Sequence, residues 1–161
     1  DPNQFKLPAL NFQIDEISCA IGILNLKKLN YLIYKRRKIL KILKKRVNSE
    51  SKLCRINYKI EGSSPFFIPV IFDEKNSKIT KEKFAFKLIK LGIQLNPSYK
   101  YLVQNWNFSK KYLADKYSCN NAKNLIKKSF NLAINEKYNI KDVSNIIRFI
   151  KSLENKYAKI V

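Results

Sequence analysis

Apolar residues recur at helical spacing along two neighbouring stretches near the amino end of the chain. The first set comprises Ile17, Ala20, Ile21 and Leu24. Asp15 stands just before this set, where it can cap a helix. A second apolar stripe runs from Leu29 to Val47, with Lys and Arg mainly on the other side. Asn30 either divides two helices as a cap or lies inside one helix that runs through. Gly22 is unfavourable within a helix and suggests close packing against a neighbour.

Short stretches rich in β-branched and aromatic residues predict a few strands further along. Residues 56–60 alternate weakly, residues 66–72 form a clearer strand, and short strands are also predicted at 93–96 and 129–134. Pro69 cannot donate to a β-ladder, so we expect an edge strand or a bulge there.

Helices are predicted between these strands. Thr80 can cap one helix that Gly92 ends, and residues 120–127 form another. Asn139 caps the last helix, with Asp142 at the capping-box position. Its predicted buried face consists of Val143, Ile146, Ile147, Ile150 and Leu153. The fold class is therefore α/β with an α+β-like character, a small sheet covered by helices.

The chain is strongly basic, with 33 Lys and Arg against 12 Asp and Glu and a net charge of +21. Five of these basic residues are arginine, at positions 36, 37, 46, 55 and 148, and the other 28 are lysine. Lysine, asparagine and isoleucine have AT-rich codons, so a codon bias explains most of this charge. The stretch from Lys35 to Arg46 could bind phosphate backbones or an acidic membrane. We favour the solvated face of an amphipathic helix.

Few residues suggest chemistry. Histidine is absent, which excludes a Ser-His-Asp triad within this chain. The three cysteines are Cys19, Cys54 and Cys119, and no two of them have the Cys-x-x-Cys spacing of a metal site. We interpret them as isolated thiols. The neighbouring carboxylates Asp73 and Glu74 are interpreted as part of a turn. Aromatic residues between 99 and 117 alternate with lysines; a stacking platform is one interpretation, and anchoring of a loop with short helices is preferred. No catalytic residue and no metal site are expected in this chain.

The run from Asn11 to Gly22 resembles a segment of the DegT/DnrJ/EryC1/StrS family of sugar aminotransferases, which carry Asn-Tyr-Arg before a helix with Ala-Ala-Ile-Gly. The resemblance continues in order along nearly the whole chain. It includes Leu26–Leu29, Lys35–Arg37, Phe66–Asp73, Leu91–Ile93, Cys119–Ala122, Ser129–Leu132 and the closing helix from Asn139.

The resemblance implies the C-terminal part of a fold-type-I enzyme that uses pyridoxal phosphate (PLP), with a small, mostly antiparallel sheet packed with helices. Residues 1–29 would form a lead-in segment and helix on the cofactor and dimer side, and residues 30–161 the small domain. The Schiff-base lysine would belong to a preceding domain absent from this chain. Family members are more than twice as long, and the chain contains no methionine. We therefore expect a piece of a longer protein that is inactive alone.

Two site residues follow from the resemblance. Asn11 matches the family asparagine that contacts the cofactor phosphate of the other subunit in a homodimer. Gln13 stands at the position of the family arginine; it is a candidate substrate-binding residue, although it carries no charge. The family histidines are also missing, with Asn96–Tyr99 in that region, so we expect substrate choice to differ from that of better-known members.

The implied function is transfer of an amino group, expected from glutamate, to a nucleotide-linked keto-sugar in amino-sugar or cell-surface polysaccharide biosynthesis. One alternative is a PLP-dependent sugar dehydratase of the same family. Another is a basic nucleic-acid-binding module, although we expect no nucleic-acid partner. No apolar run reaches the roughly 18 residues of a membrane helix, so we expect a cytoplasmic protein without membrane insertion.

Overall fold

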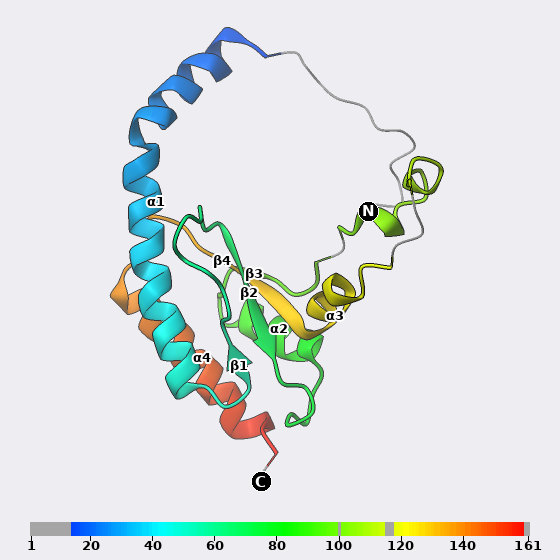
Figure 1. The fold of residues 1–161 in the computed structure, drawn as a ribbon. Coiled ribbons are helices and arrows are strands. Elements are labelled where there is room, and N and C mark those ends of the chain that lie inside the picture. Colours follow the sequence, from blue (N-terminus) through cyan, green and yellow to red (C-terminus); the bar gives the residue numbers. More distant parts are fainter. Residues whose placement is uncertain (1–13, 100, 115–117, 160–161) are drawn as a thin grey trace.

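The computed structural model describes residues 14–99, 101–114 and 118–159. Four α-helices, four strands and two short 3₁₀ helices follow one another in this part of the chain (Figure 1). In order they are α1 (Glu16–Glu50), β1 (Cys54–Arg55), β2 (Phe67–Phe72), α2 (Lys81–Lys90), β3 (Leu95–Asn96), η2 (Val103–Asn105), η3 (Ser109–Lys111), α3 (Asn120–Lys128), β4 (Ser129–Ala133) and α4 (Ile140–Tyr157).

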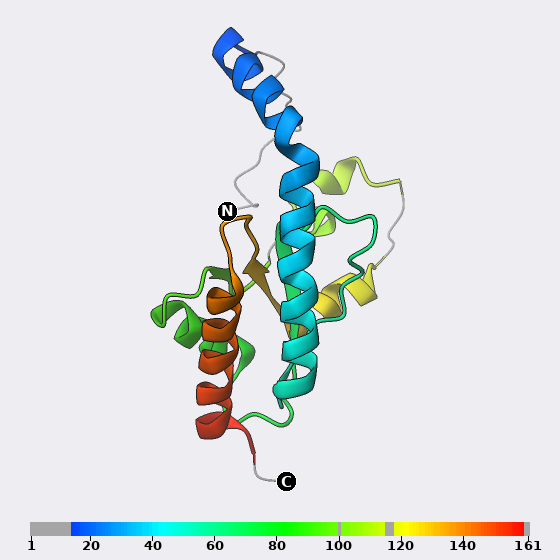
Figure 2. The ribbon, with the colours of Figure 1, turned by 90° about the vertical axis from the view of Figure 1, so that its left-hand side faces the viewer.

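The strands form one antiparallel sheet in the order β1-β2-β4-β3. Alternate residues of β2 and β4 point into a single core, which α1, α2 and α4 complete. Figures 1 and 2 show α4 lying beside the carboxyl half of α1. The largest fully buried apolar side chains are Phe84, Phe130, Leu40, Leu43, Leu53, Ile56, Ile68, Leu88, Ile134, Val47 and Val70. The predicted small sheet covered by helices is confirmed.

α1 is one helix of 35 residues that continues through Asn30. Its buried side chains, Ile39, Leu40, Leu43 and Val47, all lie in the carboxyl half. The first predicted stripe is exposed instead: Ile17 is 73% exposed and Ile21 is 54% exposed. Both views show this half of α1 extending beyond the sheet (Figures 1 and 2). A Cβ built on Gly22 meets no described atom within 4 Å, so the described residues do not supply the close neighbour that Gly22 suggested.

The helix caps agree with the sequence prediction. The Asp15 carboxylate accepts from the Ser18 N–H at 2.8 Å, and the Thr80 hydroxyl accepts from the Lys83 N–H at 3.4 Å. Asn139 caps α4 in a complete capping box with its partner at the third helical position. All five residues of the predicted α4 face are buried. Gly92, with φ +87°, directly follows the C-cap of α2.

The predicted strand at 56–60 is wrong, because pairing ends at Arg55. Asp73 N–H donates to the Leu53 carbonyl at 2.8 Å, and antiparallel ladders repeat such bonded pairs every second residue. In this register, the next hydrogen bond from β2 to the chain beyond Arg55 would have to come from Pro69, which has no N–H to donate. β2 is an interior strand of the sheet, yet its Pro69 faces the side where β1 has already ended.

Side chains of α1 replace the missing strand partner. The Asn48 amide accepts from the Ile56 N–H at 2.8 Å and donates to the Ile56 carbonyl at 3.1 Å. The Lys44 ammonium donates to the Tyr58 carbonyl at 2.8 Å. These bonds satisfy backbone groups that would otherwise need a β-ladder.

A buried carboxylate organises the turn between α1 and β1. Glu154 of α4 is 2% exposed. It accepts from the Lys52 N–H at 3.0 Å, from the Leu53 N–H at 2.8 Å and from the Ser51 hydroxyl. The Ser51 oxygen accepts in turn from the Cys54 N–H at 2.8 Å. One α4 side chain thus ties the end of α1 and the start of β1 to the same point.

Lys81 is a second buried charge that the sequence did not reveal. It is 1% exposed, and its ammonium donates to the Ile126 carbonyl at 3.1 Å and lies 3.1 Å from the Glu82 carboxylate. The first contact joins the start of α2 to the last turn of α3, whose carbonyls favour a cation. α3 has no fully buried residue of its own, so this hydrogen bond adds to the packing of α3 on β2 and β4.

We predict that Glu154→Gln lowers the free energy of unfolding of this chain by about 1–3 kcal/mol. The amide keeps one acceptor oxygen but turns an NH₂ group towards backbone N–H donors. Urea denaturation measures the change. Glu61→Gln, at an exposed carboxylate, is the matched control and should stay within about 0.5 kcal/mol of the wild type. Equal effects of the two substitutions would contradict this account of the turn.

Candidate functional site

The predicted site residues Asn11 and Gln13 lie outside the described residues, just before the start of α1. The first described feature there is the cap. One Asp15 oxygen accepts from the Ser18 N–H at 2.8 Å and the other from the Ser18 hydroxyl at 2.7 Å. These hydrogen bonds hold the pKa of Asp15 below its ordinary value. The positive end of α1 is therefore already matched by the chain's own carboxylate at neutral pH.

Residues 14–34, which contain the first half of α1 and are called the arm below, expose an unusual number of large apolar side chains. They are Ile14, Ile17, Ile21, Ile23, Leu24, Leu26, Leu29, Tyr31 and Tyr34. Ile21 and Ile23 point to nearly opposite sides, because successive helical residues are about 100° apart. A helix that is apolar on opposite sides is typical of one enclosed by protein. An exposed apolar surface of this kind indicates an interaction site.

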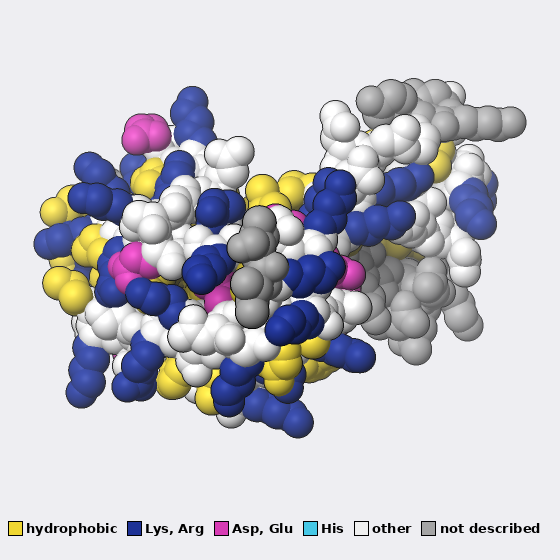
Figure 3. Space-filling view, turned by 90° about the horizontal axis from the view of Figure 1, so that it is seen from below, with side chains coloured by type: hydrophobic (Ala, Val, Ile, Leu, Met, Phe, Trp, Pro, Cys, Tyr) yellow, Lys and Arg dark blue, Asp and Glu magenta, His cyan; other side chains and the backbone are white. Residues whose placement is uncertain are grey.

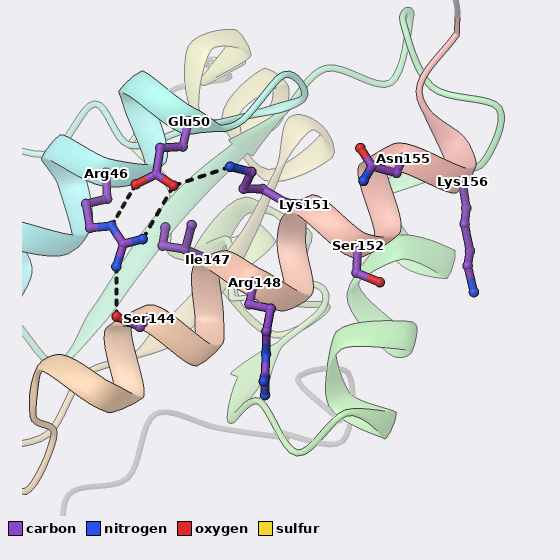
Figure 4. Close-up of a pocket in the computed structure, with 9 residues that line it drawn as sticks. All are labelled: Arg46, Glu50, Ser144, Ile147, Arg148, Lys151, Ser152, Asn155 and Lys156. Carbon is purple, nitrogen blue, oxygen red and sulfur yellow. Dashed lines mark hydrogen bonds and ion pairs between the residues drawn. The ribbon is translucent and has the colours of Figure 1, made fainter.

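A groove of about 590 Å³ lies between the carboxyl half of α1 and α4 (Figure 4). Its lining residues are Arg46, Glu50, Ser144, Ile147, Arg148, Lys151, Ser152, Asn155 and Lys156. The Arg46 guanidinium donates to Glu50 at 2.7 Å and to the Ser144 hydroxyl at 2.9 Å, and Lys151 lies 3.5 Å from Glu50. The hydrogen bond from Arg46 lowers the pKa of Glu50 and raises that of Arg46. We call this the α1–α4 groove.

A second groove, of about 440 Å³, lies between the end of α2 and the first turns of α4. Apolar side chains of Leu91, Ile93 and Phe149 and amides of Gln94 and Asn145 are among its lining residues. Tyr138 also lines it, and burial raises the pKa of that phenol. Neither groove brings together residues that the sequence singled out as a site.

Part of the basic stretch of α1 holds the fold together. Arg36 forms an ion pair with Glu136 at 2.8 Å, and Arg37 donates to the Ser63 carbonyl at 2.6 Å. The hydrogen bond from Arg36 lowers the pKa of Glu136. Figure 3, a view from below, shows Lys and Arg side chains spread over the described part of this face. The charge on this face is not gathered over one element, as expected for a lysine-rich composition.

The segment that contains η2 and η3 has the predicted form of a loop with short helices. Its rings pair locally: Tyr99 and Tyr101 are 5.4 Å apart in a T-shaped arrangement, and Trp106 and Phe108 are 5.5 Å apart. The buried Ser109 hydroxyl donates to the Trp106 carbonyl at 2.9 Å. Such contacts are consistent with anchoring of the loop.

Cys19, Cys54 and Cys119 are all free thiols, as predicted. Within the described ranges, acidic residues and cysteines form no group that could hold a metal ion. None of the described helices is long and apolar enough to span a membrane.

Residues 3–151 match the DegT/DnrJ/EryC1/StrS aminotransferase family. The chain belongs to this family. A UDP-4-amino-4,6-dideoxy-N-acetyl-beta-L-altrosamine transaminase of Campylobacter jejuni is 27% identical over 92% of the chain and 39% of its own length. A GDP-4-keto-6-deoxy-D-mannose 3-dehydratase of Yersinia pseudotuberculosis is 38% identical over 58% of the chain and 23% of its own length.

Solved structures share the fold. Helicobacter pylori PseC, described as an aminotransferase involved in pseudoaminic acid biosynthesis, superposes with a TM-score of 0.70 and 22% identity over 95% of the chain and 41% of PseC. An E. coli GDP-4-keto-6-deoxy-D-mannose-3-dehydratase with bound hydrated PLP superposes with a TM-score of 0.72 and 23% identity. The match covers 91% of this chain and 38% of the dehydratase. The chain thus spans about two fifths of the length of these relatives, and its fold is that of fold-type-I sugar aminotransferases.

The described residues do not by themselves fit PLP. The start of α1 carries Asp15, whose charge would repel a phosphate. The α1–α4 groove begins some 30 residues further along the helix, roughly 45 Å from Asp15 at 1.5 Å per residue. It is therefore too far away to share one site with the start of α1. The second groove is lined by Asp142, with Lys137 as its cation. No chemical step can therefore be derived from these residues.

We predict that a thiol reagent at pH 8 modifies Cys19 quickly and Cys54 only after unfolding. Burial raises the pKa of the Cys54 thiol well above its ordinary value, and the nearby Glu154 carboxylate adds to that rise. The thiolate is the reactive form, so Cys54 stays protonated at this pH. Cys19 is exposed on the arm. Cys19→Ser should remove the fast phase; modification of native Cys54 as fast as of Cys119 would contradict the prediction.

Proposed function

We propose that this chain is the carboxyl-terminal part of a PLP-dependent aminotransferase that acts on a nucleotide-linked keto-sugar in amino-sugar or polysaccharide biosynthesis. The observation that carries the proposal is the family match over residues 3–151, which covers all elements of the fold except the end of α4. The transaminase of Campylobacter jejuni acts on a UDP-linked amino-sugar by its name. An amino-acid donor, which we take to be glutamate, would complete the reaction in the cytoplasm.

A sugar dehydratase is the second candidate. The chain is 38% identical to the Yersinia pseudotuberculosis 3-dehydratase along a stretch of 94 residues, and this likeness favours the second candidate. The segment that would bear the Schiff-base lysine lies in the remainder of such a protein, and that segment separates the two reactions. We place no nucleic acid among the partners, because α1 uses several of its cations within the fold.

We propose a division of the chain near residue 29, and the change in exposure along α1 supports it. The arm is apolar on opposite sides and extends past the sheet, whereas the carboxyl half of α1 is part of the core. We propose that the arm packs on the PLP-binding domain of the intact enzyme and on the partner subunit of a homodimer. Without that domain the chain has no Schiff-base lysine and is inactive.

The cofactor contact assigned to this chain is Asn11. Its amide would donate to the phosphate of a PLP molecule held mainly by the preceding domain of the other subunit. Gln13, two residues nearer the helix, would contact the substrate. Both assignments rest on the match of this segment to the family, and the position of Asn11 just before the arm is consistent with a site at the edge of the proposed interface.

We predict that Asn11→Ala weakens PLP binding by the intact enzyme about tenfold to a hundredfold. A hydrogen bond to a charged group contributes about 1.5–3 kcal/mol, which corresponds to that range of affinity. Equilibrium dialysis of PLP against the dimer measures the effect. Gln13→Ala is the matched control and should change substrate affinity more than PLP affinity. Unaltered PLP binding by a correctly folded Asn11→Ala dimer would refute the assignment.

We predict that Ile21→Asp leaves the unfolding free energy of this chain within about 0.5 kcal/mol but destabilises the intact enzyme by about 2 kcal/mol or more. The first result follows from exposure of Ile21 here, and the second from loss of a buried isoleucine at the interface. Lys38→Asp, at an exposed position beside the packed half, is the control. Cys19 should also react more slowly in the intact enzyme. Equal stability of intact wild-type and Ile21→Asp enzymes would exclude the arm as an interface.

A further inference from the structure

Arginine is informative in this chain because it is rare. A lysine-rich composition explains a cation at any solvated position, but it does not explain the five arginines among 33 basic residues. Four of them have a polar partner that a planar guanidinium suits. Arg36 binds Glu136, Arg37 binds the Ser63 carbonyl, Arg46 binds Glu50 and Ser144, and Arg55 binds the Ser51 and Cys54 carbonyls.

Arg148 differs from the other four. Its guanidinium carbon lies 5.0 Å from the centre of the neighbouring Phe149 ring, which can hold the planar group in place. Among the described residues it makes no hydrogen bond or ion pair. Figure 4 shows its side chain extending from α4 with no dashed line to another lining residue. Its five N–H donors are therefore available to a ligand.

The neighbours of Arg148 suit an anion. Residues 148, 151, 152 and 155 share one face of α4, so Arg148 lies beside Lys151, Ser152 and Asn155 in the α1–α4 groove. Lys156 extends from the same helix (Figure 4). In the groove four cations stand against one carboxylate, Glu50, and that carboxylate is engaged by Arg46 and Lys151.

We infer that the α1–α4 groove is a binding site for a diphosphate, with Arg148 as its principal contact. Arginine forms paired hydrogen bonds with phosphate oxygens, and the Ser152 hydroxyl and Asn155 amide add neutral donors. The volume of about 590 Å³ is that of a small-molecule site. The groove lies roughly 45 Å along α1 from Asp15. It is therefore separate from the cofactor site proposed near Asn11, and the inference does not depend on the proposed function.

The test is a titration of this chain with inorganic pyrophosphate at about 0.15 M salt, where exposed charges further apart than the Debye length are largely screened. Amide resonances of residues 144–156 should shift and saturate. Arg148→Gln should weaken binding about tenfold, as expected for loss of a charge-assisted bond. Arg148→Lys should also weaken it, because a lysine lacks the planar fork.

Lys110→Gln, at an exposed position on η3, removes the same charge elsewhere and should leave the affinity unchanged. A parallel titration with a nucleoside diphosphate separates two sources of the ligand: tighter binding than pyrophosphate assigns a nucleotide, and equal binding assigns a free phosphate. Shifts scattered over the lysine-rich surface, an equal loss in Lys110→Gln and Arg148→Gln, or unsaturable binding would overturn the inference. Thermal denaturation of each variant checks that folding is unchanged.

Discussion

The Glu154 carboxylate fixes the place where α1 stops and the sheet begins. Three donors of the 51–53 turn point at it, and a buried carboxylate is tolerated only where its oxygens are satisfied in this way. The contact sets the end of α1 against α4, and the hydrogen bond from Arg46 to Ser144 joins the same two helices nearer the start of α4. Because α1 is a single helix, this anchor also determines where the arm at its other end lies.

Local sequence signals predicted the parts of the fold that depend on local chemistry. The caps at Asp15, Thr80 and Asn139 need only a polar side chain at the right distance from a helical N–H, and the strands at 66–72 and 129–134 needed only their apolar pattern. The prediction of a strand at 56–60 was wrong because of contacts with residues distant in sequence. Asn48, on a helix, satisfies the backbone of Ile56, and the next ladder bond beyond Arg55 would need the N–H that Pro69 lacks.

The candidate sites were less predictable. Asn11 and Gln13 came from a resemblance between whole segments, and no property of an isolated asparagine or glutamine would have indicated either residue. The α1–α4 groove could not be foreseen, because its two walls are about 100 residues apart in sequence and meet only through packing. The one available signal was the low number of arginines, since 28 lysines conceal any functional cation among them. That signal becomes informative only when the structure shows which arginines have partners.

The two halves of α1 differ in what surrounds them, and this difference has a mechanical consequence. The carboxyl half is held by the core and by contacts from Arg36, Arg37 and Lys44, so it moves with the sheet. The arm has no comparable contacts among the described residues. If the remainder of the enzyme encloses the arm, α1 becomes a rigid lever between that body and the small domain. A slight tilt of the arm is then transmitted to the sheet along the whole length of α1.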